Sequence, residues 1–191
     1  MEETNVVKTK KFDEERGAYT VGGLVGCAVL LLLYFVGWSY IYNTDGGVEV
    51  GISGWNLIIA FMTNNYKGVG AGIGQISAPF YCYAQSLTVA LSILAFVSFI
   101  FVLVIIGLSI LNICLNNKRW LSKIIHILFY ALAAIFIASI VVSLCMKHSR
   151  ILRVYCSGNP ACSMQTLIFL PAILTIGLGI VYSVFLYKYK D

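Results

Sequence analysis

Acidic residues are missing from most of this chain. The 191-residue sequence contains eight Asp and Glu, of which seven lie in the first 49 residues, and none lies between Glu49 and Asp191. Proton relays, cation-coupled carriers and most metal hydrolases need carboxylates as proton acceptors, counter-ions or ligands. Glycosidases of the usual kind need a pair of them. The sequence therefore argues against all of these mechanisms.

Other residues on which catalysis commonly depends are also scarce. The two histidines, His126 and His148, would lie roughly 33 Å apart along a helix and cannot share a ligand. There is no Cys-x-x-Cys pair, no Walker-type phosphate loop and no Gly-x-Ser-x-Gly elbow. We therefore expect no enzyme activity, no cofactor and no metal site.

The chain instead has long apolar segments. Apolar residues make up 60% of it and charged residues only 11%, against about a quarter in soluble domains. Continuous runs that reach the ~20 residues needed to cross a bilayer as a helix occur at 18–42, 86–115, 124–146 and 164–187. The predicted fold class is an all-α integral membrane protein, a four-transmembrane-helix bundle with a small strand-containing first extracytoplasmic loop.

Basic residues indicate the orientation. Nine of the thirteen Lys and Arg lie on the side that carries both termini, and four lie on the other side. The positive-inside bias places both termini of a multi-pass cell-membrane protein in the cytoplasm. Trp38 is then expected in an aromatic belt at the outer boundary. The cytoplasmic segments are 1–17, 116–123 and 188–191, and the outer loops are 43–85 and 147–163.

The long outer loop carries several local signals. Residues 48–52 alternate as a strand would, and Asp45-Gly46-Gly47 before them is turn chemistry. The apolar run 54–63 is too short to span, which favours an interfacial or re-entrant helix, with a buried strand as the alternative. We expect a hairpin or small sheet that lies on the membrane.

Glycine alternates strictly from Gly68 to Gly74, which exposes a bare backbone face. The segment can serve as a connector, as a strand that pairs with a neighbouring subunit, or as a pore lining that offers carbonyl groups, in that order of preference. The predicted partner or pore contacts in this loop are Trp55, Asn64, Asn65, Lys67, Gly68, Gly70, Gly72, Gly74 and Gln75.

The second outer loop combines cations with cysteines. Its basic residues form a rim that meets lipid headgroups or, alternatively, docks an acidic partner or an anionic solute; they include Lys147, Arg150 and Arg153. A structural disulfide is predicted between Cys156 and Cys162, because the segment between them is rich in turn residues. The alternatives join Cys82 to either of these, or leave free thiols in a reducing compartment.

Small residues predict where the spans meet, since lipid tails provide no hydrophobic drive between helices. Gly22 with Gly26 and Ala134 with Ala138 have the required spacing of four. Pro171 is expected to kink the last span after Leu170.

The layout resembles the claudin and peripheral-myelin-type tetraspan class. The shared features are four spans, internal termini, a long strand-containing first outer loop with the pair Gly54-Trp55, and a short second outer loop. That family has a Gly-Leu-Trp signature followed by two cysteines, whereas here Leu is absent before Trp55 and Cys82 is the single cysteine of the loop. The resemblance implies a barrier, adhesion or auxiliary-subunit role.

Two functions follow from the sequence. The first is a self-assembling or accessory tetraspan that contacts a neighbour through its outer loops. The alternative is an oligomeric channel or small-solute carrier with a path lined by the Gly-rich loop. The expected partners are membrane lipids and either a second copy or another membrane protein, with no nucleic acid.

The disulfide is directly testable. Non-reducing peptide mapping by mass spectrometry should recover a peptide in which Cys156 is bonded to Cys162. The matched reduced sample should lose it. Recovery of all three outer-loop cysteines as free thiols from oxidising conditions would contradict both the bond and the orientation.

Overall fold

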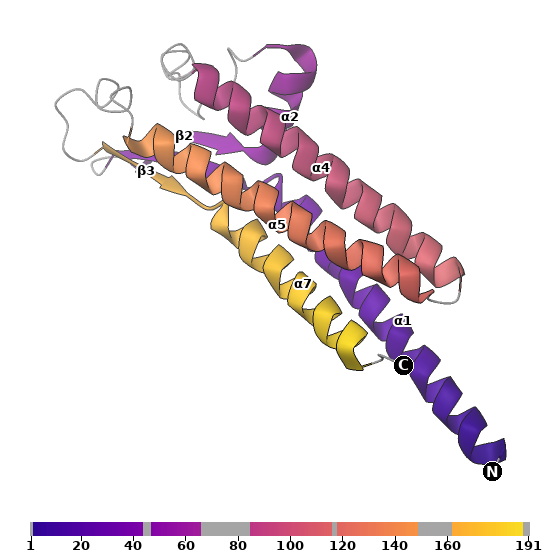
Figure 1. The fold of residues 1–191 in the computed structure, drawn as a ribbon. Helices are drawn as coiled ribbons and strands as arrows, with labels where there is room; N and C mark the ends of the chain where they lie inside the picture. The colour runs from indigo at the N-terminus through magenta and orange to yellow at the C-terminus, as the bar shows by residue number, and fades with distance from the viewer. Residues whose placement is uncertain (1, 44–46, 66–84, 116–117, 149–161, 189–191) are drawn as a thin grey trace.

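The computed structural model describes residues 2–43, 47–65, 85–115, 118–148 and 162–188. Four long helices lie along one another, and a small sheet and a short helix gather at the end opposite the termini (Figure 1). We call this the sheet end of the bundle. In chain order the elements are α1 Glu2–Leu33, β1 Gly37–Asn43, β2 Gly47–Ser53, α2 Gly54–Thr63, α4 Gln85–Cys114, α5 Arg119–His148, β3 Cys162–Thr166 and α7 Phe169–Lys188.

The long helices pack with a seven-residue repeat. Buried positions follow one another at alternating steps of three and four, the spacing that interlocks helices in left-handed bundles. On α4 the buried positions that follow this repeat are Thr88, Leu91, Ala95, Ser98, Val102, Ile105, Ser109 and Asn112, and Ser92 is buried beside them. On α5 they are Ser122, Ile125, Phe129, Leu132, Phe136, Ser139, Ser143 and Met146, and Leu121 and Ala133 are buried beside them.

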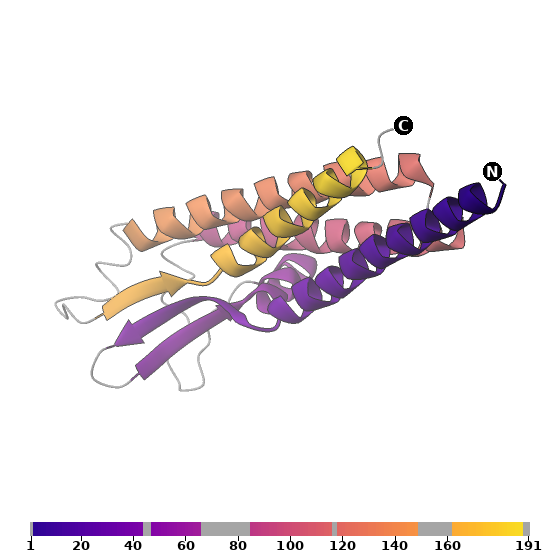
Figure 2. The ribbon, with the colours of Figure 1, turned by 90° about the horizontal axis from the view of Figure 1, so that it is seen from below.

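The helices form a closed ring. Helix α4 packs against α1 and α5, and α7 packs against α5 and α1 (Figure 2). Across the middle of the ring the buried positions are large and apolar, and none of these side chains has exposed surface: Leu30, Val102, Ile105, Phe129 and Leu132. At this level the side chains fill the interior of the described bundle and leave no surface exposed.

Three helices are long and apolar enough to cross a membrane: Ser86–Cys114, Arg119–Lys147 and Phe169–Tyr187. This fits the predicted helical membrane protein. The apolar part of α1, Gly17–Leu33, is shorter. It would extend roughly 25 Å, against a hydrocarbon core of about 30 Å. The fourth span therefore stays a prediction.

Two predicted span boundaries were wrong. The first span was expected to run to residue 42, but the helix ends at Leu33 and Gly37–Asn43 is strand β1. The last span was expected from residue 164, but Cys162–Thr166 is strand β3 and the helix begins at Phe169. Strand β1 is aromatic and apolar enough to resemble a helix end, and β3 directly precedes an apolar helix, yet the two segments pair with each other as strands.

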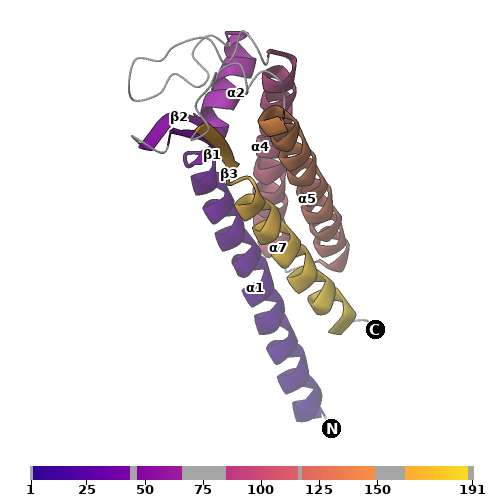
Figure 3. The same ribbon diagram turned by 90° about the vertical axis from the view of Figure 1, so that its left-hand side faces the viewer.

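The sheet has the order β2-β1-β3, and β1 is antiparallel to both neighbours (Figure 3). Ile41 of β1 lies opposite Val50 on one side and Met164 on the other. The strand expected over residues 48–52 lies within β2. The sheet thus joins the segment that follows α1 to the residues before the last helix.

The expected packing residues fall in different places. Gly26 lies against the Leu178 side chain, whereas Gly22 faces open space and the neighbouring Gly23 touches Tyr182 instead. Ala134 and Ala138 are exposed on α5.

The expected kink at Pro171 is replaced by a different role. This residue lies in the first turn of α7, where the missing N–H has no partner to lose. It suits the start of this helix and needs no kink.

The α1–α7 contact makes a stability test possible. A Cβ at Gly23 would lie 2.5 Å from the Tyr182 hydroxyl oxygen, while at Gly22 nothing lies within 4 Å. Gly23→Ala should therefore destabilise the detergent-solubilised protein by about 1–3 kcal/mol through overpacking. Thermal unfolding followed by circular dichroism measures the change.

Gly22→Ala is the matched control and should leave the unfolding temperature unchanged or raise it slightly, because Ala favours helix over Gly. Adding Tyr182→Phe to Gly23→Ala should restore part of the loss by removing the nearest atom. Equal unfolding temperatures for the two alanine variants would contradict this packing.

Candidate functional site

Trp38 joins the sheet to the bundle. Its side chain is only 2% exposed, and its indole Nε1–H donates to the Leu33 carbonyl oxygen at 3.1 Å. Its own carbonyl oxygen accepts from the Leu167 N–H at 2.8 Å and from the Thr166 hydroxyl at 3.1 Å. One residue therefore connects the end of α1 to the segment that leads into α7.

Tyr34 extends this junction into the bundle. Its hydroxyl is hydrogen-bonded to that of Ser98 on α4 at 2.6 Å, and its ring lies 5.1 Å from that of Trp38. The ring of Phe136 on α5 packs against Trp38 at 5.9 Å. Aromatic pairs at these distances add to the stabilisation from burial. The side chains of Tyr34 and Trp38 thus contact α1, α4 and α5.

Helix α2 begins on the same junction. A Cβ at Gly54 would lie 2.5–2.8 Å from atoms of the Trp38 ring, so only glycine allows α2 to start here. The Ser53 hydroxyl caps the helix by accepting from the Asn56 N–H at 3.1 Å. The Trp55 N–H donates to the Tyr34 carbonyl oxygen at 2.8 Å. We call the sheet together with α2 the sheet platform.

One face of α2 is apolar and exposed. Trp55, Ile59 and Met62 are spaced at i, i+4 and i+7, so they lie on one side of the helix. The Trp55 ring packs at 5.3 Å against that of Phe35, which continues the face onto the chain after α1. Phe35 is 64% exposed and Met62 69%. We call these four residues the α2 stripe.

The predicted loop contacts that the structure describes are mainly structural. Trp55 is half-buried and also meets the Phe99 ring at 5.9 Å. Asn64 ends α2 in the left-handed conformation, with φ 48°, and its N–H bonds to carbonyl oxygens of the last turn. The Asn65 N–H donates to the Ala60 carbonyl oxygen. The remaining predicted contacts lie outside the described residues: Lys67, Gly68, Gly70, Gly72, Gly74 and Gln75.

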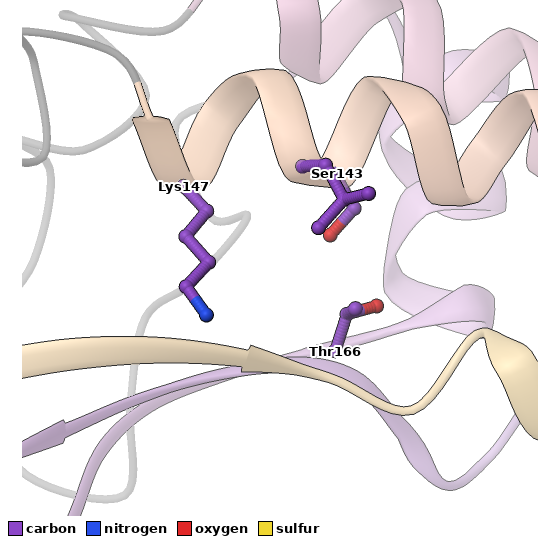
Figure 4. A pocket seen from close by; sticks show the side chains of 4 residues that line it. Ser143, Lys147 and Thr166 are labelled. Carbon is purple, nitrogen blue, oxygen red and sulfur yellow. The ribbon is translucent and has the colours of Figure 1, made fainter.

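Lys147 of the predicted basic rim extends from the end of α5 toward β3 (Figure 4). With Ser143, Leu144 and Thr166 it lines a cavity of about 30 Å³. Cofactor and ligand pockets usually measure about 300–1,000 Å³, so this one has room for little more than ordered water. Arg150 and Arg153 lie outside the described residues.

The cysteines that the structure describes with their side chains are free thiols: Cys27, Cys114 and Cys145. Cys82 and Cys156 lie outside the described residues, and Cys162 is described only by its backbone, as the first residue of β3. The Cys156–Cys162 bond and its alternatives therefore stay predictions.

The opposite end of the bundle holds a buried polar layer. The Asn112 amide nitrogen donates to the Ser122 hydroxyl at 3.2 Å and to the Thr20 hydroxyl at 3.5 Å. These contacts link α4 to α5 and α1, and such interhelical hydrogen bonds are worth about 0.6–2 kcal/mol in membranes. No local pattern predicts that these three residues meet, although the seven-residue repeat of α4 ends on Asn112.

Comparison with protein-family models and with curated proteins finds no match to this chain. Among the residues that the structure describes, no three His, Cys, Asp or Glu side chains gather at a point that could hold a metal ion. The sheet platform and the bundle are therefore the features that bear on function.

Replacing Trp38 tests whether it secures the platform. Trp38→Ala should cost about 3–5 kcal/mol, the usual range for a buried tryptophan. Hydrogen exchange read by mass spectrometry should show loss of protection in β1, β3 and α2 before any loss in α4 and α5. The matched control Trp120→Ala removes an exposed tryptophan and should leave protection of the platform unchanged. Uniform loss of protection across all helices would contradict a local role.

Proposed function

We propose that this chain is a non-enzymatic tetraspan membrane protein that assembles, with further copies of itself or as an accessory subunit of another membrane protein, through its sheet end. The observation that carries the proposal is the sheet platform, held on Trp38 and presenting the α2 stripe. This end faces outside if the charge bias sets the orientation.

The sheet platform is suited to binding because it is ordered by the bundle itself. It is anchored to α1, α4 and the start of α7 by Trp38, Tyr34 and Gly54. Binding a partner therefore carries little conformational-entropy cost for ordering the platform. Neighbouring exposed apolar side chains, such as Phe35, Ile59 and Met62 of the α2 stripe, commonly mark an interaction or membrane-contact surface.

The sheet offers a second means of contact. Within the described part of the chain, β2 pairs with β1 alone and so lies at the edge of the sheet. An edge strand presents unpaired N–H and C=O groups that a strand from a neighbour can join. The α2 stripe and the β2 edge both belong to the sheet platform.

The packed interior weighs against the alternative function. A channel or carrier with a path inside one chain would have to cross the layer formed by Leu30, Val102, Ile105, Phe129 and Leu132, all without exposed surface. A pore is compatible with this bundle only between copies. We therefore keep assembly as the proposed function and rank conduction below it.

The resemblance to the claudin and peripheral-myelin-type class belongs to the same proposal. What supports it is the arrangement in which Gly54-Trp55 follows a strand hairpin and starts a short helix on the first outer segment. The role that the resemblance implies, barrier, adhesion or auxiliary subunit, is one of contact and agrees with assembly.

Photo-cross-linking at the α2 stripe tests the proposal. With benzoylphenylalanine at Met62, irradiation of intact membranes should give a protein adduct well above the 21.0 kDa of one chain. The same probe at Ile137, an exposed apolar position in the middle of α5, is the matched control and should give no discrete protein adduct.

Two outcomes would contradict the proposal. One is equal cross-linking at Met62 and Ile137, which would mean that the stripe meets only lipid and random collisions. The other is robust unitary conductance of the purified protein in planar bilayers, which would favour the channel.

A further inference from the structure

A polar cluster lies between α5 and α7 near the end of the bundle opposite the sheet. The Ser183 hydroxyl on α7 lies 2.6 Å from Nε2 of His126 and 3.1 Å from the hydroxyl of Tyr130, both on α5. It also donates to the Gly179 carbonyl oxygen at 3.0 Å. The Tyr130 ring lies over Gly179, where a Cβ would be only 3.3 Å from it.

The cluster is on the outside of the bundle, unlike the buried layer around Asn112. Tyr130 is 42% exposed, and His126 and Ser183 are half-buried. Next to them in sequence are strongly exposed branched apolar side chains: Ile127, Ile180 and Val184. In a helix that crosses a membrane, such a surface faces lipid.

One hydrogen-bonding atom of the cluster has no partner among the described residues. A neutral imidazole has one donor nitrogen and one acceptor nitrogen, and Nε2 is taken by Ser183. Within the described residues no group is bonded to the other nitrogen, Nδ1. The single O–H of Ser183 is donated to Gly179, so Ser183 accepts from the Nε2–H of His126, and Nδ1 is an acceptor that needs a donor. An unpaired polar atom is costly in an apolar environment, so Nδ1 calls for a partner.

The depth of the cluster identifies where that partner comes from. His126 lies seven residues after Arg119, the first residue of α5, or roughly 10 Å along the helix. Ser183 lies five residues before Lys188, the last of α7, or roughly 8 Å. Trp120 and the 82% exposed Tyr187 lie beyond it, as aromatic residues do at a membrane boundary. The cluster is therefore level with the junction of headgroups and acyl chains.

We propose that His126, Tyr130 and Ser183 form a binding site for a membrane lipid that carries a free hydroxyl group. A lipid hydroxyl can donate to Nδ1, whereas an ester carbonyl only accepts and cannot pair with it. The branched side chains beside the cluster contact the apolar body of the lipid, which water alone would leave exposed. Sterols and diacylglycerols both have this chemistry. The site is separate from the sheet platform and does not depend on the proposed function.

Photoactivatable lipids test the site on the full-length protein in phosphatidylcholine nanodiscs. One arm uses a diazirine sterol, a second uses a diazirine diacylglycerol, and a third uses a diazirine phosphatidylcholine without a free hydroxyl. We expect one or both hydroxyl lipids to label peptides around residues 126–130 and 179–184. Labelling should saturate and fall at least five-fold with excess unlabelled lipid of the same kind. The arm that responds identifies the source of the hydroxyl.

Matched variants separate recognition from general lipid contact. His126→Phe and Tyr130→Phe keep ring size but remove the polar atoms, and each should lower the saturable labelling at least three-fold. Tyr187→Phe removes a hydroxyl from the same surface outside the cluster and should leave labelling unchanged. The unfolding temperature of each variant identifies any that fails to fold.

The proposal is overturned if neither hydroxyl lipid gives competable labelling of the wild-type protein, a result that needs no variant. It is also overturned if phosphatidylcholine labels the same peptides to the same saturable extent, since the hydroxyl would then be irrelevant. Competable labelling that survives both His126→Phe and Tyr130→Phe would likewise exclude this site.

Discussion

The seating of Trp38 at the top of the bundle is the contact on which the sheet end depends. Its carbonyl oxygen holds the segment before α7, its indole N–H returns to the end of α1, and its ring is the surface on which α2 starts. A small sheet of five- to seven-residue strands gains stability when it packs against a helix. Trp38 therefore makes the platform a continuation of the bundle core.

A second constraint comes from the surroundings of the bundle. Helices that cross lipid have no water to satisfy stray polar groups, so most of a packed interior is apolar or pairs its polar atoms internally. Here large apolar side chains fill the middle, and Tyr34 with Ser98 and Asn112 with Ser122 pair on either side of it, while Asn112 Oδ1 and Ser109 Oγ have no partner among the described residues. This distribution leaves the ends and the lipid-facing surface as the places where the molecule can recognise something else. The stripe on α2 and the cluster at His126 are such places.

Parts of this arrangement could be predicted from local signals. The strand over residues 48–52 and the short helix over 54–63 were both expected, because alternation and a capped apolar run are properties of neighbouring residues. Trp38 was expected in an interfacial belt because hydropathy counts only how apolar a residue is. Its ring packs against Gly54 and Phe136 and its carbonyl oxygen is bonded by Thr166, and no local pattern announces that these distant positions meet.

Composition and run length were enough to predict a helical membrane protein with few carboxylates, because both need only counts along the chain. Its seven-residue spacing also indicates which helix faces are buried, as from Thr88 to Asn112 on α4. Three outcomes became visible in the folded chain alone: the end of the first apolar run is a strand, Gly23 rather than Gly22 meets α7, and His126 meets Ser183. Those outcomes depend on long-range pairing, in which the partner of a residue is chosen by the geometry of the whole bundle.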